Sequence, residues 1–414
     1  MRGLLFVCAG LLAFSACDLR MERPGPVVLD APADGSVLGA TAVEFSWWAG
    51  ERSEWQFQVG EDGFSDPVRD DTVIVDEDHL VTWSAELPAD GEFDWRVRAR
   101  SSEGVWGDWS ETRSFTIERY HIVTTVSTPG YPQDIWVLDN RAYIADGQAG
   151  LAVFDVSVPA SPVLQGGVMD SLNEAHGVYA DDSLAFVAYG YKELLVADVR
   201  NPDSMFVAGE LEYPQPGFGF DIARRDSFLY IAADAQFIIV KLVEAAYPEL
   251  VFQYRYPRGL RGVCLQDSLC FLALEQIGVA IWNVGTIPPV AVGSFDTPSN
   301  ARSVAAVPGH LYVADGRNGV LHANVSDPAN PVVDTAALEM PGYATRLTAR
   351  DSLLVVGCGD GGVAIVDITE PGLPELSAIV PTPNCRNATV SGGRIYACDR
   401  DLGLVVIERK EQLP

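Results

Sequence analysis

The chain has 414 residues, of which 48% are hydrophobic, and it carries a formal net charge of −29. That apolar content can build two or three folded domains and excludes a largely disordered chain. The negative charge would repel phosphate backbones, so we expect no nucleic-acid partner.

The N-terminus has the layout of an export signal. A basic start, Met1-Arg2, precedes an apolar run over residues 3–14, which is too short to span a bilayer but suits a signal-peptide core. The run ends in Phe14-Ser-Ala-Cys17, which resembles the lipobox of bacterial lipoproteins, except that Phe14 stands where that pattern has Leu. An ordinary signal peptide with a coincidental cysteine is the alternative.

The lipobox resemblance implies removal of a signal peptide over residues 1–16 and diacylation of the Cys17 thiol. Two acyl chains anchor a protein stably, so we expect the membrane as a partner through this lipid. The expected location is the bacterial cell envelope, at the outer membrane or cell surface or on the periplasmic face of a membrane. Residues 17–26, with two prolines, are typical of a tether.

Residues 27–118 are predicted to form a β-sandwich. Short runs such as Ala42–Trp47, Glu54–Val59 and Glu92–Arg98 alternate polar and apolar residues, and Asp-Gly turns separate them. About seven such strands in a segment of this length are typical of a two-sheet sandwich.

The same segment resembles a bacterial fibronectin type III domain, on the residues Ala31-Pro-Ala-Asp-Gly35, Phe45-Ser-Trp47, Trp95–Ala99 and Trp109-Ser110. Trp47 and Trp95 lie in strand patterns and are expected in the core. A second set, if exposed, would form a sugar-binding or protein-binding face. That set is Trp48, Trp106 and Trp109.

Residues 119–410 contain a repeat. An aromatic or apolar residue recurs every 41–44 residues, at Tyr143, Phe186, Tyr230, Phe271, Tyr312, Val355 and Tyr396. Each unit has a short first strand, a tight turn, the strand with this residue, a very apolar third strand and a weaker fourth. Four strands per unit of this length predict the blades of a β-propeller, here seven.

The seventh unit stops after three strands, at Val406–Glu408. We expect Ile122–Val126 to supply its missing fourth strand and close the ring, which removes the last open edge. An open solenoid is the alternative, and it would leave two edges uncovered.

The third-strand sequence Ala364-Ile-Val-Asp367 and the corner Val325–Pro331 resemble the LVIVD-repeat family of bacterial β-propellers. The resemblance implies a propeller fold and no particular activity. The predicted fold class is therefore all-β, with an N-terminal fibronectin type III-like sandwich followed by a seven-bladed propeller that an N-terminal strand closes.

No catalytic motif is present: the sequence has no nucleophile elbow, no zinc spacing and no phosphate loop. The five histidines are scattered through different predicted elements, so we expect no metal and no cofactor.

The candidate binding site is the mouth of the central channel, where the first strands of a propeller begin. The candidate residues there are Asp134, His176, Asp221, Arg261, Arg302, Arg346 and Arg386. Grouped arginines would capture an anionic ligand. The alternative is that they are paired, either with Asp134 and Asp221 or with the strand-end acids Asp146, Asp234, Asp315, Asp360 and Asp399.

Two disulfides are considered. Cys264 and Cys270 flank a turn at Asp267-Ser268. A three-residue turn would place the two cysteines opposite each other and permit a bridge, whereas a two-residue turn would offset them by one and face them apart. Among Cys358, Cys385 and Cys398 one pair is expected, and the choice of pair stays open.

We expect a monomeric, non-catalytic lipoprotein that recognises an envelope protein or glycan through the propeller face. The alternatives are an enzyme that acts on an anionic substrate at the arginine-lined mouth, and a scaffold that provides rigid spacing.

Overall fold

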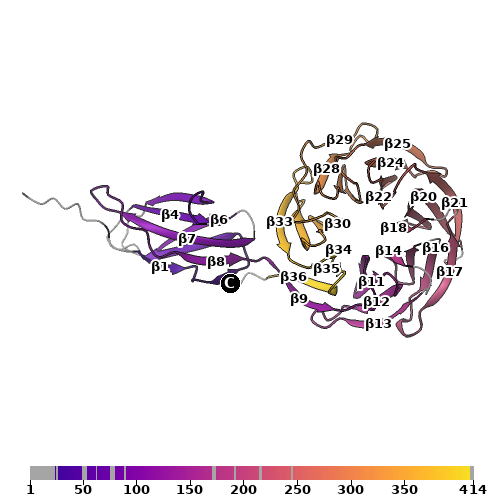
Figure 1. Cartoon of the computed structure of the whole chain (residues 1–414), viewed down its shortest axis with the longest axis horizontal. Coiled ribbons are helices and arrows are strands. Elements are labelled where there is room, and N and C mark those ends of the chain that lie inside the picture. Colours follow the sequence, from indigo (N-terminus) through magenta and orange to yellow (C-terminus); the bar gives the residue numbers. More distant parts are fainter. Residues whose placement is uncertain are drawn as a thin grey trace, which may run out of the picture. The chain divides into compact units, whose positions relative to one another are not determined.

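The computed structural model describes residues 24, 27–48, 54–61, 63–74, 80–87, 90–169, 174–190, 193–213, 217–243 and 246–410. The predicted signal peptide at residues 1–16, Cys17 and all of the tether at residues 17–26 but Pro24 lie outside these ranges. The chain divides into two compact units between Ile117 and Glu118 (Figure 1). Within the described ranges no helix has the length and apolarity that a membrane crossing would need.

The N-terminal unit consists of two sheets. One sheet has the strand order β1 (Val28–Ala31), β3 (Ala42–Trp48) and β6 (Leu80–Glu86). The other has the order β2 (Ser36–Leu38), β8 (Arg113–Ile117), β7 (Gly91–Arg100), β4 (Glu54–Gly60) and β5 (Arg69–Ile74). Trp47 and Trp95 are fully buried in the shared core, as predicted, together with Trp55.

Strand β7 alternates from Phe93 onward, with residues 93, 95, 97 and 99 buried and its arginines on the outer face. On that face arginines and aromatic rings form a stack. Arg96 lies between Phe64 and Trp109, 3.8 and 4.2 Å from the ring centroids. Arg98 lies between Trp109 and Trp106, at 4.4 and 5.1 Å. This stack holds the segment that follows β7 against the sheet.

Hydrogen bonds fix the guanidinium groups of the stack. Gln58 of β4 accepts two from Arg96, and Gln56 accepts two from Arg98. The three tryptophans considered for an exposed face therefore have different environments. Trp106 and Trp109 are half-buried in the stack, whereas Trp48 lies outside it and is 57% exposed.

We expect Trp109→Ala to destabilise the N-terminal unit by about 2 kcal/mol, because it removes two cation–π contacts and their packing. The matched change Trp48→Ala removes an exposed ring and should cost less than about 1 kcal/mol. Chemical unfolding of the full chain followed by tryptophan fluorescence measures both, since seven of the nine tryptophans lie in this unit. Equal shifts for the two variants would contradict a stabilising role for the stack.

The C-terminal unit is built from repeated four-stranded antiparallel sheets. The first three are β10 (Asp134–Leu138), β11 (Arg141–Ala145), β12 (Leu151–Asp155), β13 (Val163–Val168); β14 (Ala175–Ala180), β15 (Leu184–Tyr189), β16 (Glu193–Asp198), β17 (Phe206–Glu212); and β18 (Gly219–Arg225), β19 (Phe228–Ala233), β20 (Gln236–Val243), β21 (Tyr247–Arg255). A 3-10 turn, η1 (Pro202–Ser204), precedes β17.

The remaining sheets are β22 (Gly262–Gln266), β23 (Leu269–Ala273), β24 (Val279–Asn283), β25 (Val290–Phe295); β26 (Ser303–Val307), β27 (His310–Ala314), β28 (Val320–Asn324), β29 (Val332–Val333); β30 (Arg346–Arg350), β31 (Leu353–Gly357), β32 (Val363–Asp367), β33 (Glu375–Val380); and β34 (Cys385–Ser391), β35 (Arg394–Asp399), β36 (Gly403–Arg409), β9 (Tyr120–Val126). Figure 1 shows these sheets around a common centre, with the first strand of each innermost.

Packing between neighbouring sheets explains why the third strands are so apolar. Side chains of adjacent sheets fill shared clusters, such as the one in which Tyr143 and Val153 of the first sheet meet Val178 and Val187 of the second. Because both faces of a middle strand are covered in this way, its residues are buried regardless of alternation.

The last sheet takes its outer strand from the beginning of the unit. Strand β9 pairs antiparallel with β36, and Ile122 lies opposite Ile407. This is the predicted closure, and it contradicts the open solenoid because the edge of β36 is covered.

Candidate functional site: the central channel

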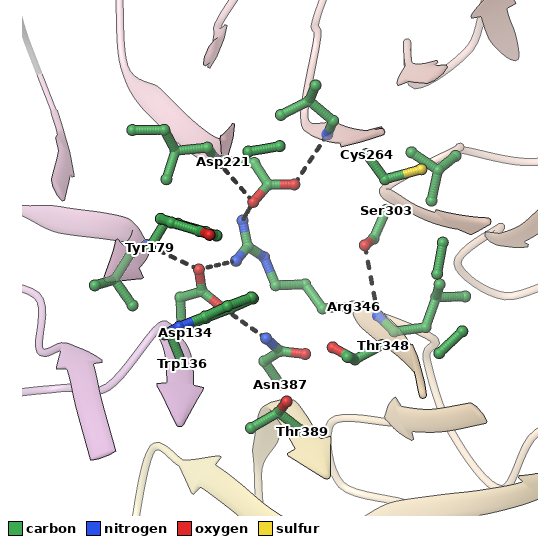
Figure 2. A pocket seen from close by; sticks show the side chains of 18 of the residues that line it. Asp134, Trp136, Tyr179, Asp221, Cys264, Ser303, Arg346, Thr348, Asn387 and Thr389 are labelled. Carbon is green, nitrogen blue, oxygen red and sulfur yellow. Dashed lines mark hydrogen bonds and ion pairs between the residues drawn. The ribbon is translucent and has the colours of Figure 1, made fainter. Parts of the chain in front are cut away.

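The mouth of the central channel is a cavity of about 200 Å³. It is lined by Gln133, His176, Phe220, Arg261, Arg302, Thr345, Arg346 and Arg386, so each of the four-stranded sheets contributes at least one residue. Five of the seven candidate residues are therefore brought together here. The other two, Asp134 and Asp221, line a second cavity of about 300 Å³, to which Arg346 also contributes (Figure 2).

Arg346 spans the channel and binds both of these carboxylates (Figure 2). Its Nη1 lies 2.6 Å from Asp134 Oδ2, and its Nη2 lies 3.4 Å from Asp221 Oδ1. Nη2 also donates to the carbonyl oxygen of Phe220. Asn387 donates to the other oxygen of Asp134 at 2.6 Å. The predicted alternative of pairing is thus correct for Arg346.

The same two aspartates join neighbouring first strands. Asp134 Oδ2 accepts from the backbone N–H of Val178, and Asp221 Oδ2 accepts from that of Val263, at 3.0 and 2.9 Å. The hydroxyl oxygen of Ser303 in β26 likewise accepts a hydrogen bond from the backbone N–H of Leu347 in β30, at 3.5 Å. Side-chain hydrogen bonds at this level therefore join neighbouring first strands of the ring.

Burial raises the pKa of Asp221 to about 6; the charge of Arg346 opposes this shift, and the charge of Asp134 adds to it. For Arg346, burial acts to lower the pKa, but Asp134 and Asp221 outweigh it and raise the value above the ordinary range. The guanidinium is therefore charged, and Asp221 titrates near pH 6.

The mouth has more positive than negative groups. Arg261 Nε and Arg302 Nη1 lie 2.6 and 3.3 Å from the same atom, Glu275 Oε1. Arg386 forms no ion pair within the described ranges, and its buried Nε has no hydrogen-bond partner there. Burial lowers the pKa of Arg302, and the charge of Arg261 contributes to that shift.

Glu275 was not among the predicted site residues. Its φ is +43°, and it forms the same isolated backbone bridge to the next sheet as three glycines of other repeats. These are Gly147, Gly316 and Gly359, with φ of +57°, +61° and +58°. A left-handed conformation costs a non-glycine residue roughly 1–2 kcal/mol. The chain therefore keeps a strained backbone where it places the counter-ion of two arginines.

The position of the Glu275 side chain also depends on Gly259, which packs against its carboxylate. A Cβ atom at Gly259 would lie 2.2 Å from Glu275 Oε2, so only glycine leaves room for this carboxylate. The sequence feature that could have pointed to Glu275 is an acidic residue at a repeat position where three other repeats have glycine.

Aromatic rings form the opposite wall. The Arg261 guanidinium lies over the Phe220 ring, 3.9 Å from its centroid, and His176 contacts Phe220 and Phe218. Burial lowers the pKa of His176, Glu174 opposes the shift, and Arg346 and Arg261 add to it, so the imidazole is neutral at pH 7. The positive charge of the mouth comes from the arginines.

Three of the strand-end acids that were considered as partners of the mouth arginines have a different role. Asp146, Asp315 and Asp399 are fully buried. Their carboxylates accept hydrogen bonds from the backbone N–H groups of Gly130, Ser299 and Asn384, at 2.6, 3.0 and 2.7 Å. Each therefore fastens the loop that enters its sheet.

The candidate disulfide between Cys264 and Cys270 does not form, and the two-residue alternative for the turn is correct. The turn at Asp267-Ser268 has two residues, and Cys270 lies opposite Leu265. The two cysteines are offset by one and face apart, and both thiols are free.

No pair forms among Cys358, Cys385 and Cys398 either, because all three are free and fully buried. Cys385 lies opposite Asp399, and a bulge places Asn387 opposite Cys398, so these two cysteines are out of register. Burial raises the pKa of Cys358 to about 12.

Two histidines that the sequence placed in separate elements meet in one sheet. His310 Nδ1 lies 2.9 Å from His322 Nε2, and His322 Nδ1 lies 2.9 Å from Asp334 Oδ2. Because His322 uses both ring nitrogens, this chain is a packing feature. Within the described ranges, no cluster of three or more His, Cys, Asp or Glu residues is arranged to hold a metal.

Comparison with known proteins agrees with this architecture. The LVIVD repeat matches residues 129–170, 174–212, 298–335 and 341–382. No curated protein matches the sequence. The chain is therefore a β-propeller repeat protein that contains LVIVD repeats.

Solved structures support the fold alone, because their sequence identity is low. A chain of the mitotic checkpoint complex is 12% identical with a TM-score of 0.59, over 70% of this chain and 92% of its own. The WD40 β-propeller domain of Doa1 is 10% identical with a TM-score of 0.56, over 70% and 97%. The computationally designed Ika8 protein is 8% identical with a TM-score of 0.52, over 75% and 92%.

The raised pKa of Asp221 predicts a pH dependence. Between about pH 4 and 6 the folded state holds a proton that the unfolded carboxyl has lost, so the contribution of this group falls as pH rises. The unfolding free energy of wild type minus that of Asp221→Asn should decrease by roughly 2–3 kcal/mol from pH 4 to 7. Urea unfolding across this range measures the difference.

Asp367→Asn is the control with the opposite sign. Hydrogen bonds from Thr369 lower the pKa of Asp367, so the wild-type advantage over this variant should grow as pH rises through the acid range. A flat difference for Asp221→Asn would contradict the assigned burial of its carboxyl.

Proposed function

We propose that the protein is a lipid-anchored lipoprotein of the bacterial cell envelope whose propeller recognises a protein or glycan. In this proposal a fibronectin type III-like sandwich at residues 27–118 carries a seven-bladed propeller at residues 119–410. The lipobox-like end of the apolar run, the two-sheet packing of the first unit and the seven four-stranded sheets of the second support these parts.

The observation that carries the recognition role is the charge imbalance at the mouth. Four guanidinium groups line it: Arg346 is bound to Asp134 and Asp221, and the single carboxylate of Glu275 offsets the other three. Arginines with free N–H donors bind carboxylates and phosphates with bidentate hydrogen bonds, and in a strongly acidic protein such a site selects an anionic group. The ligand group is therefore anionic, and the propeller face around the mouth contacts the rest of the partner.

A capture experiment tests this role. Full-length wild type and an Arg261→Ala/Arg302→Ala/Arg386→Ala variant would be used to retrieve partners from detergent-solubilised envelope extracts. We expect the variant to lose specific partners, since it loses the anion-binding groups. The matched control is Arg200→Ala/Arg258→Ala/Arg317→Ala, which removes the same charge from exposed positions outside the mouth. Identical partner sets for all three proteins would refute recognition at the mouth.

The anchor is tested separately. Cys17→Ser should abolish acylation and shift the protein from the membrane to the soluble envelope fraction, because two acyl chains supply the anchoring energy. Cys8→Ser, a change within the predicted signal peptide, should leave both unchanged. Mass spectrometry of the N-terminal peptide and membrane fractionation measure the result. A Cys17→Ser protein that stays acylated would contradict Cys17 as the lipid-attachment site.

A further inference from the structure

The mouth is small for a ligand site. Its volume of about 200 Å³ lies below the range of cavities that enclose drug-sized molecules. It therefore accommodates a charged head group or side chain, while the remainder of a larger ligand stays outside.

Two of the arginines are held in position before a ligand arrives. Arg261 is fixed by the Phe220 ring below its guanidinium and by Glu275 at its Nε. Arg302 shares the same Glu275 oxygen. A guanidinium has five N–H donors, so one contact to Glu275 leaves most donors of each arginine for a ligand. The Nε of Arg386 is buried without a partner within the described ranges, and no ion pair there occupies its two terminal nitrogens.

The carboxylates beneath the mouth are already engaged. Asp134 and Asp221 line the lower cavity and are bound to Arg346 and to backbone N–H groups. Arg346 forms the floor of the mouth with its charge already compensated. Arg261, Arg302 and Arg386 line the mouth, and Glu275 contacts the first two, so these four groups together carry two net positive charges.

We infer that the mouth binds a dianionic group, either a pair of carboxylates or a phosphate monoester, and that Glu275 sets this charge. This inference rests on the proposed recognition role and specifies its ligand. A dianion brings the cluster to neutrality, whereas a monoanion leaves one partly buried guanidinium without a partner, which is costly. Without Glu275 the three arginines would carry three positive charges and no negative one. The left-handed backbone that places Glu275 beside them therefore sets the charge of the preferred ligand.

Calorimetric titration of the detergent-purified full chain tests the inference with a matched pair of ligands. Succinate and monomethyl succinate differ by one charge at nearly equal size. We expect succinate to bind at least tenfold more tightly, and inorganic phosphate at pH 8 to compete with it. Whether succinate or phosphate binds more tightly then distinguishes the dicarboxylate from the phosphate source.

Two conservative variants, checked for folding by circular dichroism, test whether the ligand binds at the mouth. Arg386→Gln lowers the net charge to one, so the preference for succinate over its monoester should fall below threefold. Glu275→Gln raises the net charge to three and should tighten succinate binding at least threefold. Binding that neither variant changes would place the ligand elsewhere and overturn the inference.

The outcomes separate this inference from the recognition role. Equal binding of succinate and monomethyl succinate would overturn the dianion preference and leave anion recognition in place. If wild type binds neither the carboxylates nor phosphate, anion binding at the mouth is refuted, and both proposals lose their basis.

Discussion

Closure of the ring by β9 and β36 is the pairing on which the channel depends. A curved row of sheets with a free edge can open, and the distance between first strands far apart in sequence would then vary. When the first strand of the unit covers the last sheet, each first strand gains neighbours on both sides. Asn387, in the last sheet, can then reach Asp134 in the first, a hydrogen bond across 253 positions of chain. Side chains from every sheet therefore meet at fixed distances around one axis.

Electrostatic groups in the channel are separated by level. The lower level holds two acids, one arginine and many backbone donors, and its hydrogen bonds join neighbouring strands. The upper level holds arginines, one strained acid and aromatic rings, and many of its donors lack protein partners. The groups that join the strands and most of the groups that line the mouth are thus different residues, because successive positions along a first strand occupy different depths.

Much of this architecture followed from the sequence, since the spacing of strands depends on local patterns. Regular recurrence of an aromatic strand predicted the sheets, and the missing last strand predicted the closure. Positions at the start of each first strand gave the residues of the mouth. These features require only the repeat and the period of a strand.

Other features could not be predicted because they depend on backbone details. Glu275 reaches the mouth through a left-handed φ and the space at Gly259. The choice between a two-residue and a three-residue turn before Cys270 decided whether a disulfide could form, and the sequence allowed both. The contact of His310 with His322 depends on cross-strand register, and the stacking of Trp109 depends on a segment without regular structure. Sequence patterns constrain such geometry only weakly.

Arg346 lines both cavities of the channel, and this has a consequence for any ligand of the mouth. Its guanidinium is tied to acids of two other sheets, Asp134 and Asp221, which line the lower cavity. A ligand that drew this guanidinium toward the mouth would weaken its contacts with those two acids. Occupancy of the mouth and the protonation of the acids below it would then be thermodynamically linked through one cation.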